Sequence, residues 1–446
     1  MTKIRGAIVT PSDPRYDDAR RVFYGSVDKH PAMIIRAADA ADVQHVVNSA
    51  RDGGHQLAVR SGGHSPAGHS STDGGIVLDL RDLSEIDIDL KQRTAWVGAG
   101  STALAFTEAV QKQGLVVGFG DSGSVGVGGI TLGGGVGFLV RKYGLTIDSL
   151  LAADVVTADG QLVRASADEH PDLFWAIRGG GGNFGVVTRL QFRLHDIQPF
   201  TGGMLLLPAT ADTIAGFVAA SLAAPEELSS IANVMPAPPM PFIPKEVHGT
   251  LVIMALMAYV GDDAAAQRAI APFRALASPL ADMVKPMPYV GMYPPEDPNM
   301  HPSAVARTMF LDAFDRATAE TIVDFLSRSD APMRATQLRV LGGAVTRVPS
   351  DATAFAFRDR AMIVNLASFY DSPETRVKRE AWVTQFAEAL QPNDASCYVN
   401  FLGNEGEARI RAAYPGATWD RLTRIKATYD PENLFHLNQN IPPASE

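Results

Sequence analysis

Cysteine is almost absent from this sequence. The 446-residue chain contains one, Cys397, and a single thiol can build neither a disulfide framework nor a cysteine-ligated zinc or iron–sulfur site. Histidine pairs of the HxH or HExxH type are also missing, as is any cluster with metal-ligand spacing. We therefore expect no metal ion, and the scarcity of cysteine fits a reducing compartment.

Long apolar runs and excess basic charge are missing too. The longest apolar run, Leu251–Val260, has ten residues, about half of what a membrane helix needs. The first 18 residues contain no apolar segment of the secretory type. The 39 basic residues are outnumbered by 49 acidic ones, for a formal net charge of −10. This balance argues against nucleic acid or an anionic membrane as a partner. We expect a soluble, cytoplasmic monomer or homodimer that acts on a small molecule.

Several common enzyme signatures are absent. No GxxxxGK[ST] loop and no GxSxG elbow occurs, which argues against a P-loop nucleotidase and an α/β-hydrolase. Gly180, Gly182 and Gly185 fit the dinucleotide pattern GxGxxG. That pattern is diagnostic only between a strand and the start of a helix. Here a predicted helix comes before it and a strand after it, so we reject a Rossmann site.

The chain is too long for one ordinary core, which predicts more than one domain. Short strands and helices alternate over the first 198 residues. Apolar periodicity predicts strands at 34–36, 57–60, 76–80, 94–98 and 186–194. Helices are predicted from Val43 to Ala50, from Ser101 as N-cap through Lys112, and at 172–178 after Pro171.

The sequence changes in character around Pro199. A segment dense in proline and methionine, 235–244, reads as a loop or lid. Strands are predicted at 251–260, 337–341 and 362–369, and helices at 264–276, 319–327 and 373–390, the last capped by Ser372. This order predicts a second domain, 199–397, in which helices cover one face of a sheet. The polar, turn-rich segment 398–446 is expected to return to the first domain.

Two glycine-rich segments carry the chemical signal. The first, Arg60-Ser61-Gly62-Gly63-His64-Ser65, follows a strand directly. Consecutive glycines let backbone N–H groups converge on an anion such as a diphosphate, although a plain hairpin turn explains the segment equally well. The second, Gly118–Gly137, interleaves glycine with apolar residues, which disfavours a polar linker. The residues alone predict a phosphate-bearing cofactor in a glycine cradle, and they leave the role of His64 open.

Five motifs taken together resemble one family. They are RSGGHS (60–65), DGGIVLDL (73–80), VGVGGITLGGGVGFLVRKYGL (125–145), HPDLFWAIRGGGGNFGVVT (170–188) and YDPENLFHLNQNIP (429–442). The sequence is similar here to the flavoprotein oxidases related to berberine bridge enzyme. The resemblance implies an α+β, vanillyl-alcohol-oxidase-type (PCMH-type) FAD-binding domain of two subdomains, formed by 1–198 with 398–446. It also implies that 199–397 is a substrate domain whose antiparallel sheet lies over the flavin.

The same resemblance assigns FAD-binding roles. His64 takes the place of the histidine that carries the flavin at its 8α carbon. The diphosphate would be lined by Arg60, Ser61, Gly62, Gly63, Ser65 and His69. The flavin and ribityl chain would lie along Gly120, Ser122, Val125, Gly126, Gly128, Gly129, Leu132, Gly133, Gly134 and Gly137. The adenine side would be closed by Gly185, Val186 and Val187. Members with two covalent links have a cysteine at the position of Ser122, so a single histidyl link is expected.

The resemblance also points to catalytic residues. Val125 matches a gate position where valine accompanies oxidases and leucine accompanies dehydrogenases. Tyr398 and Asn400 match a YxN motif near the flavin, with ordinary packing as the alternative. Asn365 is the polar candidate on the strand at 362–369. Val136 replaces the tyrosine of the plant alcohol-oxidising members.

These features predict an oxidase that transfers hydride from a small amine or alcohol to FAD and passes the electrons to dioxygen, giving hydrogen peroxide. An amine is favoured, because an alcohol needs a base and the strand at 362–369 offers no carboxylate. An apolar or aromatic substrate is indicated if the following residues form a pocket roof rather than core: Met235, Met240, Phe242, Met287, Tyr289, Met292 and Tyr293. The alternatives are a dehydrogenase with another acceptor and a non-catalytic flavin-containing binding protein.

Overall fold

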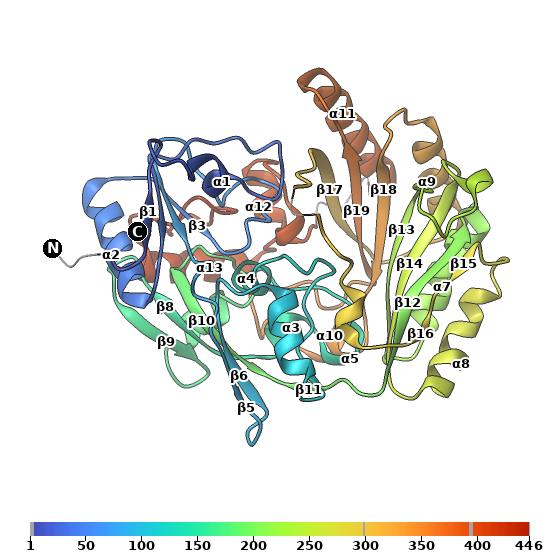
Figure 1. The fold of residues 1–446 in the computed structure, drawn as a ribbon, viewed down its shortest axis with the longest axis horizontal. Coiled ribbons are helices and arrows are strands. Elements are labelled where there is room, and N and C mark those ends of the chain that lie inside the picture. The colour runs from blue at the N-terminus through green and yellow to red at the C-terminus, as the bar shows by residue number, and fades with distance from the viewer. Residues whose placement is uncertain (1–3, 298, 392–395, 446) are drawn as a thin grey trace.

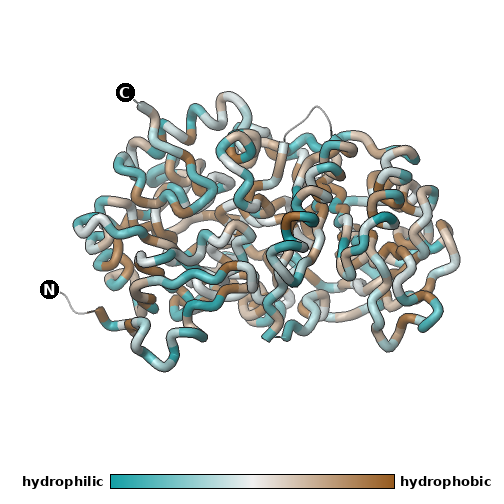
Figure 2. The backbone as a smooth tube through the Cα atoms, turned by 90° about the horizontal axis from the view of Figure 1, so that it is seen from above, coloured by the Kyte–Doolittle hydropathy of each residue, from teal (hydrophilic) through white to brown (hydrophobic). Residues whose placement is uncertain are grey.

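The computed structural model describes residues 4–297, 299–391 and 396–445. Figure 1 shows two halves side by side. The first half combines the N-terminal part of the chain with the red C-terminal segment, and the middle of the chain forms the second half. In Figure 2 the apolar stretches lie mostly in the interior of both halves, while hydrophilic segments follow the outside.

A small parallel sheet begins the first half. Strand β4 lies between β2 and β3 and runs parallel to both, while β1 pairs antiparallel with β2. Helix α2 buries Val43, Val46, Val47 and Ala50, the predicted apolar face. It ends at Gly54, whose φ of 63° lies in the left-handed region that glycine tolerates. The elements here are β1 (Ala7–Val9), α1 (Tyr16–Arg20), β2 (Met33–Arg36), α2 (Ala40–Gly53), β3 (Leu57–Arg60) and β4 (Ile76–Asp79).

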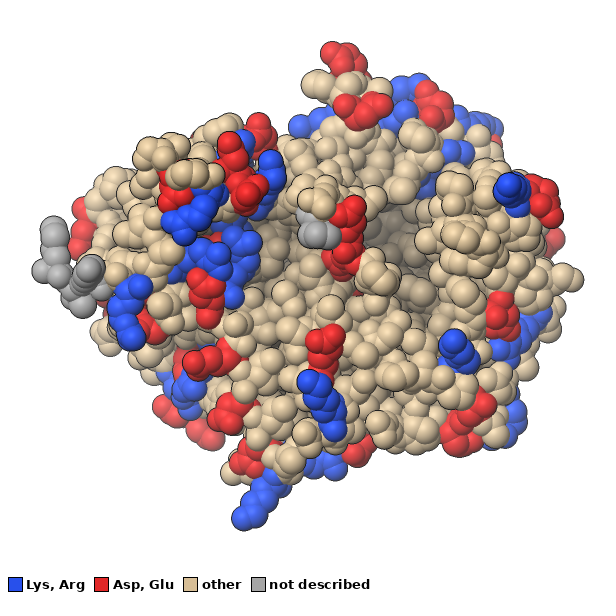
Figure 3. Space-filling view, viewed as in Figure 1, with Lys and Arg blue, Asp and Glu red and all other residues tan. Residues whose placement is uncertain are grey.

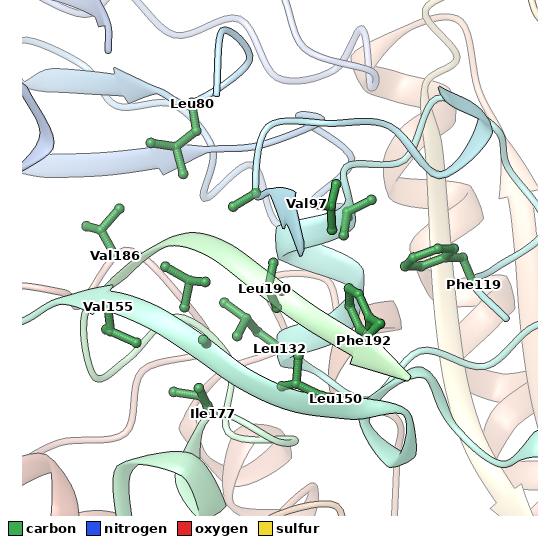
Figure 4. Close-up of a cluster of buried hydrophobic side chains, with 14 of the residues drawn as sticks. Leu80, Val97, Phe119, Leu132, Leu150, Val155, Ile177, Val186, Leu190 and Phe192 are labelled. Carbon is green, nitrogen blue, oxygen red and sulfur yellow. The ribbon is translucent and has the colours of Figure 1, made fainter. Parts of the chain in front are cut away.

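An antiparallel five-stranded sheet completes this half, with the order β5-β6-β10-β8-β9. Its apolar side chains pack with the glycine-rich segment in one large core, in which Leu132 and Phe119 approach Leu190 and Phe192 of β10 (Figure 4). The elements are β5 (Ile86–Asp89), β6 (Thr94–Gly98), α3 (Ala103–Gln111), β7 (Leu115–Val116), α4 (Val127–Leu132), α5 (Val140–Tyr143), β8 (Leu150–Val156), β9 (Leu162–Ser166), α6 (Pro171–Ala176), β10 (Val186–Arg193) and β11 (His195–Asp196).

The second half is built on a larger antiparallel sheet with the order β15-β12-β14-β13-β18-β19-β17, in which β16 also pairs with β12. Its strands are β12 (Phe200–Pro208), β13 (Leu228–Pro236), β14 (Leu251–Val260), β15 (Ala281–Asp282), β16 (Lys285–Pro286), β17 (Ala304–Leu311), β18 (Arg334–Val340) and β19 (Met362–Phe369). The predicted bounds of β14 and β19 are confirmed.

Helices cover one face of this large sheet, as predicted (Figure 1). They are α7 (Ala211–Ala223), α8 (Asp263–Arg274), α9 (Arg316–Arg328) and α11 (Pro373–Leu390), with the short α10 (Ala344–Arg347) lying elsewhere. Because side chains alternate along a strand, β19 turns Met362, Val364 and Leu366 toward the helices. Its intervening residues Ile363 and Asn365 face the first half of the molecule.

The C-terminal segment packs on the first half of the molecule through α12 (Glu407–Ala412) and α13 (Ala417–Tyr429). Lys426 is fully buried and donates to the carboxylate of Asp430 and, at 2.7 Å, to the carbonyl of Asn183. Tyr414 adds a 3.1 Å hydrogen bond to the carbonyl of Gly179. These contacts tie the end of the chain to the loop before β10.

Several local predictions need correction. The strand predicted at 337–341 is β18 (Arg334–Val340), and strands β8, β12, β13 and β17 were not predicted. The side chain that caps α3 is Thr102, which accepts from Ala105 N, rather than Ser101. The glycine-rich stretch contains a helix, α4, that its low helix propensity had hidden. By contrast, Ser372 caps α11 as predicted, and α11 has the predicted bounds.

Candidate functional site

A cavity of about 400 Å³ lies between the two halves of the molecule. Figure 3 shows the surface hollowed between them, with acidic side chains beside the hollow. The cavity is lined by both glycine-rich segments, by three strands of the large sheet (β17, β18 and β19) and by the C-terminal segment. Most of the predicted site residues line it: Ser61, Gly62, Gly63, His64, Ser65, His69, Gly120, Ser122, Val125, Gly126, Gly128, Gly129, Leu132, Gly185, Val186, Val187, Asn365, Tyr398 and Asn400.

The two glycine-rich segments touch each other at the cavity wall. A Cβ atom on Gly62 would lie 2.2 Å from Gly126 N, and one on Gly126 would lie 2.2 Å from Gly62 N. Real Cβ atoms do not approach so closely, so this contact requires glycine on both sides. Gly129 differs, because a Cβ there would meet nothing within 4 Å. The backbone around Gly129 is therefore open toward the cavity.

Four predicted cofactor residues do not line the cavity. Arg60 is buried behind it and donates to Asp79 Oδ2 (2.9 Å) and Ala19 O (2.7 Å). Added Cβ atoms on Gly133 and Gly137 would lie 1.9 Å from Asn400 Oδ1 and 1.3 Å from Phe119 O, while Gly134 faces Phe355 and Tyr398. These glycines allow close packing of protein on protein rather than of protein on ligand.

His64 lines the cavity. Its ring stacks on Phe23 with 4.2 Å between centroids, and its Nε2 atom lies 2.8 Å from Ser124 Oγ. Burial lowers the pKa of His64 and outweighs the opposing charges of Glu296 and Asp121. The imidazole is therefore neutral at physiological pH, and its Nδ1 atom has no hydrogen-bond partner among the described residues.

Tyr398 also lines the cavity and is 2% exposed. Its hydroxyl oxygen accepts from Gly135 N (2.8 Å) and from Asn400 Nδ2 (2.9 Å). Burial raises the pKa of Tyr398 to about 12, even though these hydrogen bonds oppose the shift. The phenol thus stays protonated at neutral pH, with an O–H available to a molecule in the cavity.

The large sheet contributes a polar group that the sequence did not single out. Arg339 of β18 is buried and donates to Asp121 Oδ2, Val136 O and Gln337 Oε1, each at 2.8 Å. Asp121 and Arg339 both line the cavity together with Asn365, whose buried Oδ1 has no hydrogen-bond partner in the described chain. One sequence signal was available, because Asp121 is the only charged residue between Gly118 and Gly137. No sequence motif around Arg339 indicated that this residue would line the cavity.

The predicted apolar roof does not exist. None of its seven residues lines the cavity. Tyr289, Met292 and Tyr293 are buried in the core of the first half of the molecule, and Met240 and Phe242 are exposed at 38% each. The loop at 235–244 is thus not a lid over this cavity, and the core-filling alternative holds for the buried residues.

In the part of the chain that the structure describes, no three His, Cys, Asp or Glu side chains are placed to hold a metal ion. None of the helices described there is both long and apolar enough to cross a membrane.

Family comparisons define the class of protein. Residues 31–166 match the FAD binding domain family, and residues 397–442 match the family of berberine and berberine-like proteins. The chain belongs to the FAD-linked oxidoreductases of this berberine-bridge-enzyme-like family, since relatives at 30% identity and above span 99% of it. The predicted family, fold class and enzyme class are confirmed.

Individual relatives cover nearly the whole chain. An uncharacterised FAD-linked oxidoreductase of Bacillus subtilis is 31% identical over 99% of this chain and 98% of its own. The (R)-6-hydroxynicotine oxidase of Paenarthrobacter nicotinovorans is 30% identical over 99% and 97%, respectively. The crystal structure of 6-hydroxy-D-nicotine oxidase from Arthrobacter nicotinovorans has a TM-score of 0.88 at 27% identity and covers 99% of both chains. A xylooligosaccharide oxidase of Thermothelomyces thermophilus is 29% identical over 93% of this chain and 88% of its own.

The Tyr398 hydroxyl provides the first prediction. Tyr398→Phe removes the acceptor for Gly135 N and Asn400 Nδ2 and should lower the free energy of unfolding by about 1–3 kcal/mol. Reduction of the flavin by substrate should slow markedly, because the O–H facing the cavity is lost. Anaerobic stopped-flow spectroscopy measures this step.

The matched control is Tyr16→Phe, which removes a buried hydroxyl that donates to Pro31 O at 2.7 Å, away from the cavity. It should cost similar stability and leave flavin reduction unchanged. Equal reduction rates in all three proteins would limit Tyr398 to packing.

Proposed function

We propose that this protein is an oxidase that transfers a hydride from a small amine or alcohol to covalently attached FAD and passes the electrons to dioxygen. The observation that carries the proposal is the cavity itself. It brings a neutral histidine, a protonated tyrosine and a carboxylate together with open glycine backbone. Relatives that oxidise hydroxynicotine and xylooligosaccharides by name support the reaction class.

The residues present fit FAD. Besides the open backbone at Gly129, the cavity wall offers Ser70, whose buried Oγ has no hydrogen-bond partner among the described residues. Burial lowers the pKa of the neighbouring His69 to about 4, so its neutral ring adds no charge there. The segments 61–65, 120–129 and 185–187 would hold the cofactor. When bound, FAD supplies the acceptor for two electrons.

Covalent attachment through His64 is supported by its position and charge state. A neutral imidazole has a nucleophilic lone pair, which a protonated one lacks. Ser122 lines the same cavity where a second, cysteinyl link would need a thiol, and Cys397 is buried outside the cavity lining. We therefore propose a single 8α-histidyl link.

The substrate side of the proposal rests on Asp121. The structure removes the reason for favouring an amine, because a carboxylate does reach the cavity, from the glycine-rich loop rather than from β19. Asp121 Oδ2 accepts hydrogen bonds from Arg339 and Gln337. Asp121 Oδ1 is then left to accept a hydrogen bond from an N–H or O–H group of the substrate. Asn365 Oδ1 provides a second acceptor on the same wall. The substrate is thus a small molecule with a hydrogen-bond donor at the carbon that is oxidised.

The covalent link gives a direct prediction. Denatured wild-type protein should stay yellow, and the flavin-bearing tryptic peptide should contain His64. His64→Ala should fold and hold FAD non-covalently, because the glycine contact at Gly62 remains. Acid precipitation followed by in-gel fluorescence separates the two states.

The control is His55→Ala, which changes an exposed histidine and should keep acid-stable flavin. Release of all flavin from the wild type by acid would rule out covalent attachment.

Asp121 should act on the substrate rather than on cofactor retention. Asp121→Asn keeps the shape of the side chain but removes the charge, so flavin reduction should slow by about 10²–10⁴-fold. A panel of small amines and alcohols, mixed anaerobically with the wild type, identifies a substrate by bleaching of the flavin, and the variant is then measured with it.

The matched control is Asp282→Asn, which alters another arginine-paired aspartate, 2.6 Å from Arg274 and outside the cavity. In this variant the substrate should reduce the flavin at the wild-type rate. If no member of a broad panel bleaches the wild type, the non-catalytic binding protein becomes the better description.

Val125 should control access of dioxygen to the flavin. One added methylene fills a small gap in a packed interior, so Val125→Leu should slow reoxidation while anaerobic reduction stays nearly unchanged. Stopped-flow mixing of reduced protein with oxygenated buffer measures the rate, and Val163→Leu in β9, outside this cavity, is the control. If the wild type reoxidises as slowly as Val125→Leu, the protein is a dehydrogenase with another acceptor.

A further inference from the structure

Glu296 reaches from the middle part of the chain to the loop that holds His64 in place. Its Oε1 atom accepts from Ser122 Oγ (2.8 Å), Gly123 N (2.9 Å) and Ser124 N (3.3 Å). Its Oε2 atom accepts a short hydrogen bond from Ser124 Oγ. Neither the sequence motifs nor the proposed reaction gives this carboxylate a role.

The directions of these hydrogen bonds fix the proton on His64. A carboxylate only accepts, so Ser124 must donate its single O–H to Glu296. Ser124 Oγ then acts as the acceptor in its 2.8 Å contact with His64 Nε2, and the ring proton lies on Nε2. The Nδ1 atom therefore holds a free lone pair.

The charge states agree with this assignment. Burial acts to raise the pKa of Glu296, but the hydrogen bonds from Ser124 and Ser122 outweigh it and the pKa is lowered. Burial likewise keeps His64 neutral. A charged carboxylate thus faces a neutral, singly protonated ring through one hydroxyl. This is the arrangement by which a carboxylate fixes the tautomer of a histidine and stabilises its charged form.

We propose that Glu296 and Ser124 are positioning residues for flavin attachment, which hold His64 in the Nε2–H form and remove its proton as Nδ1 bonds to the flavin. The proposal rests on the covalent link proposed above. It extends that proposal to the residues that make the bond form.

The reaction balances with dioxygen as the oxidant. The Nδ1–C bond forms at the 8α carbon of FAD, and one C–H bond of that methyl group breaks. The Nε2 proton passes through Ser124 to Glu296, and the proton of the C–H bond leaves to water. The two electrons of the C–H bond reduce the flavin, and dioxygen takes them with two protons to give hydrogen peroxide.

The test follows attachment rather than turnover. Full-length apoprotein from riboflavin-starved cells is mixed with FAD, and acid-stable flavin is measured against time by in-gel fluorescence. Glu296→Gln and Ser124→Ala should slow attachment by about a hundredfold. Ser124→Thr keeps the hydroxyl and should attach flavin at close to the wild-type rate. Asp297→Asn removes the neighbouring carboxylate charge and should behave as the wild type.

Non-covalent FAD affinity, measured by quenching of flavin fluorescence, separates positioning from folding. The proposal expects this affinity to change by less than the attachment rate in Glu296→Gln. It is overturned if affinity and rate fall in parallel, if Ser124→Thr does not restore attachment, or if Glu296→Gln attaches flavin at the wild-type rate. A wild type that forms no acid-stable flavin overturns the covalent link itself, and with it this role.

Discussion

The contact between Gly62 and Gly126 is the constraint on which the site depends. It lets the loop after β3 and the loop before α4 approach to a distance that any side chain would prevent. His64 and Ser124 lie two residues from these glycines on either side of the contact, which is why their side chains meet at 2.8 Å. The buried ion pair of Arg60 and Asp79 supports the first loop from behind. The position of His64 is thus a consequence of the backbone packing of Gly62 against Gly126.

One face of the large antiparallel sheet lines the cavity, and its opposite face packs against helices. On the side of β18 and β19 that faces the helices, apolar side chains such as Leu338, Val364 and Leu366 belong to a core of the second half. The opposite side carries Arg339 and Asn365 at the cavity. Arg339 contacts both Asp121 and the carbonyl of Val136. One buried guanidinium therefore links the two halves of the molecule and fixes the only carboxylate among the described cavity-lining residues.

The relatives of this chain differ in the substrates that their names give. The relatives share nearly the full length of the chain, although their names include a hydroxynicotine oxidase and a xylooligosaccharide oxidase. Backbone contacts such as that of Gly62 and Gly126 form part of the cavity wall. Side chains of the large sheet, such as Arg339 and Asn365, form another part of the lining, and function depends on such site residues rather than on the fold itself.

The sequence by itself determined part of the local structure and, through the resemblance of its motifs, the family. Apolar periodicity indicated the bounds of β6, β14, β19 and α11. The resemblance of five motifs to one family indicated the flavoprotein class. Both signals lie within short stretches of adjacent residues. Only the tertiary structure decided which side chains meet. Arg339 lies 218 positions from Asp121 and Glu296 lies 172 from Ser124, and their contacts depend on sheet register and on how the two halves pack. The methionine- and tyrosine-rich segments illustrate the same limit, since composition marked them as apolar but could not tell whether they face a substrate or, like Tyr289 and Met292, the core.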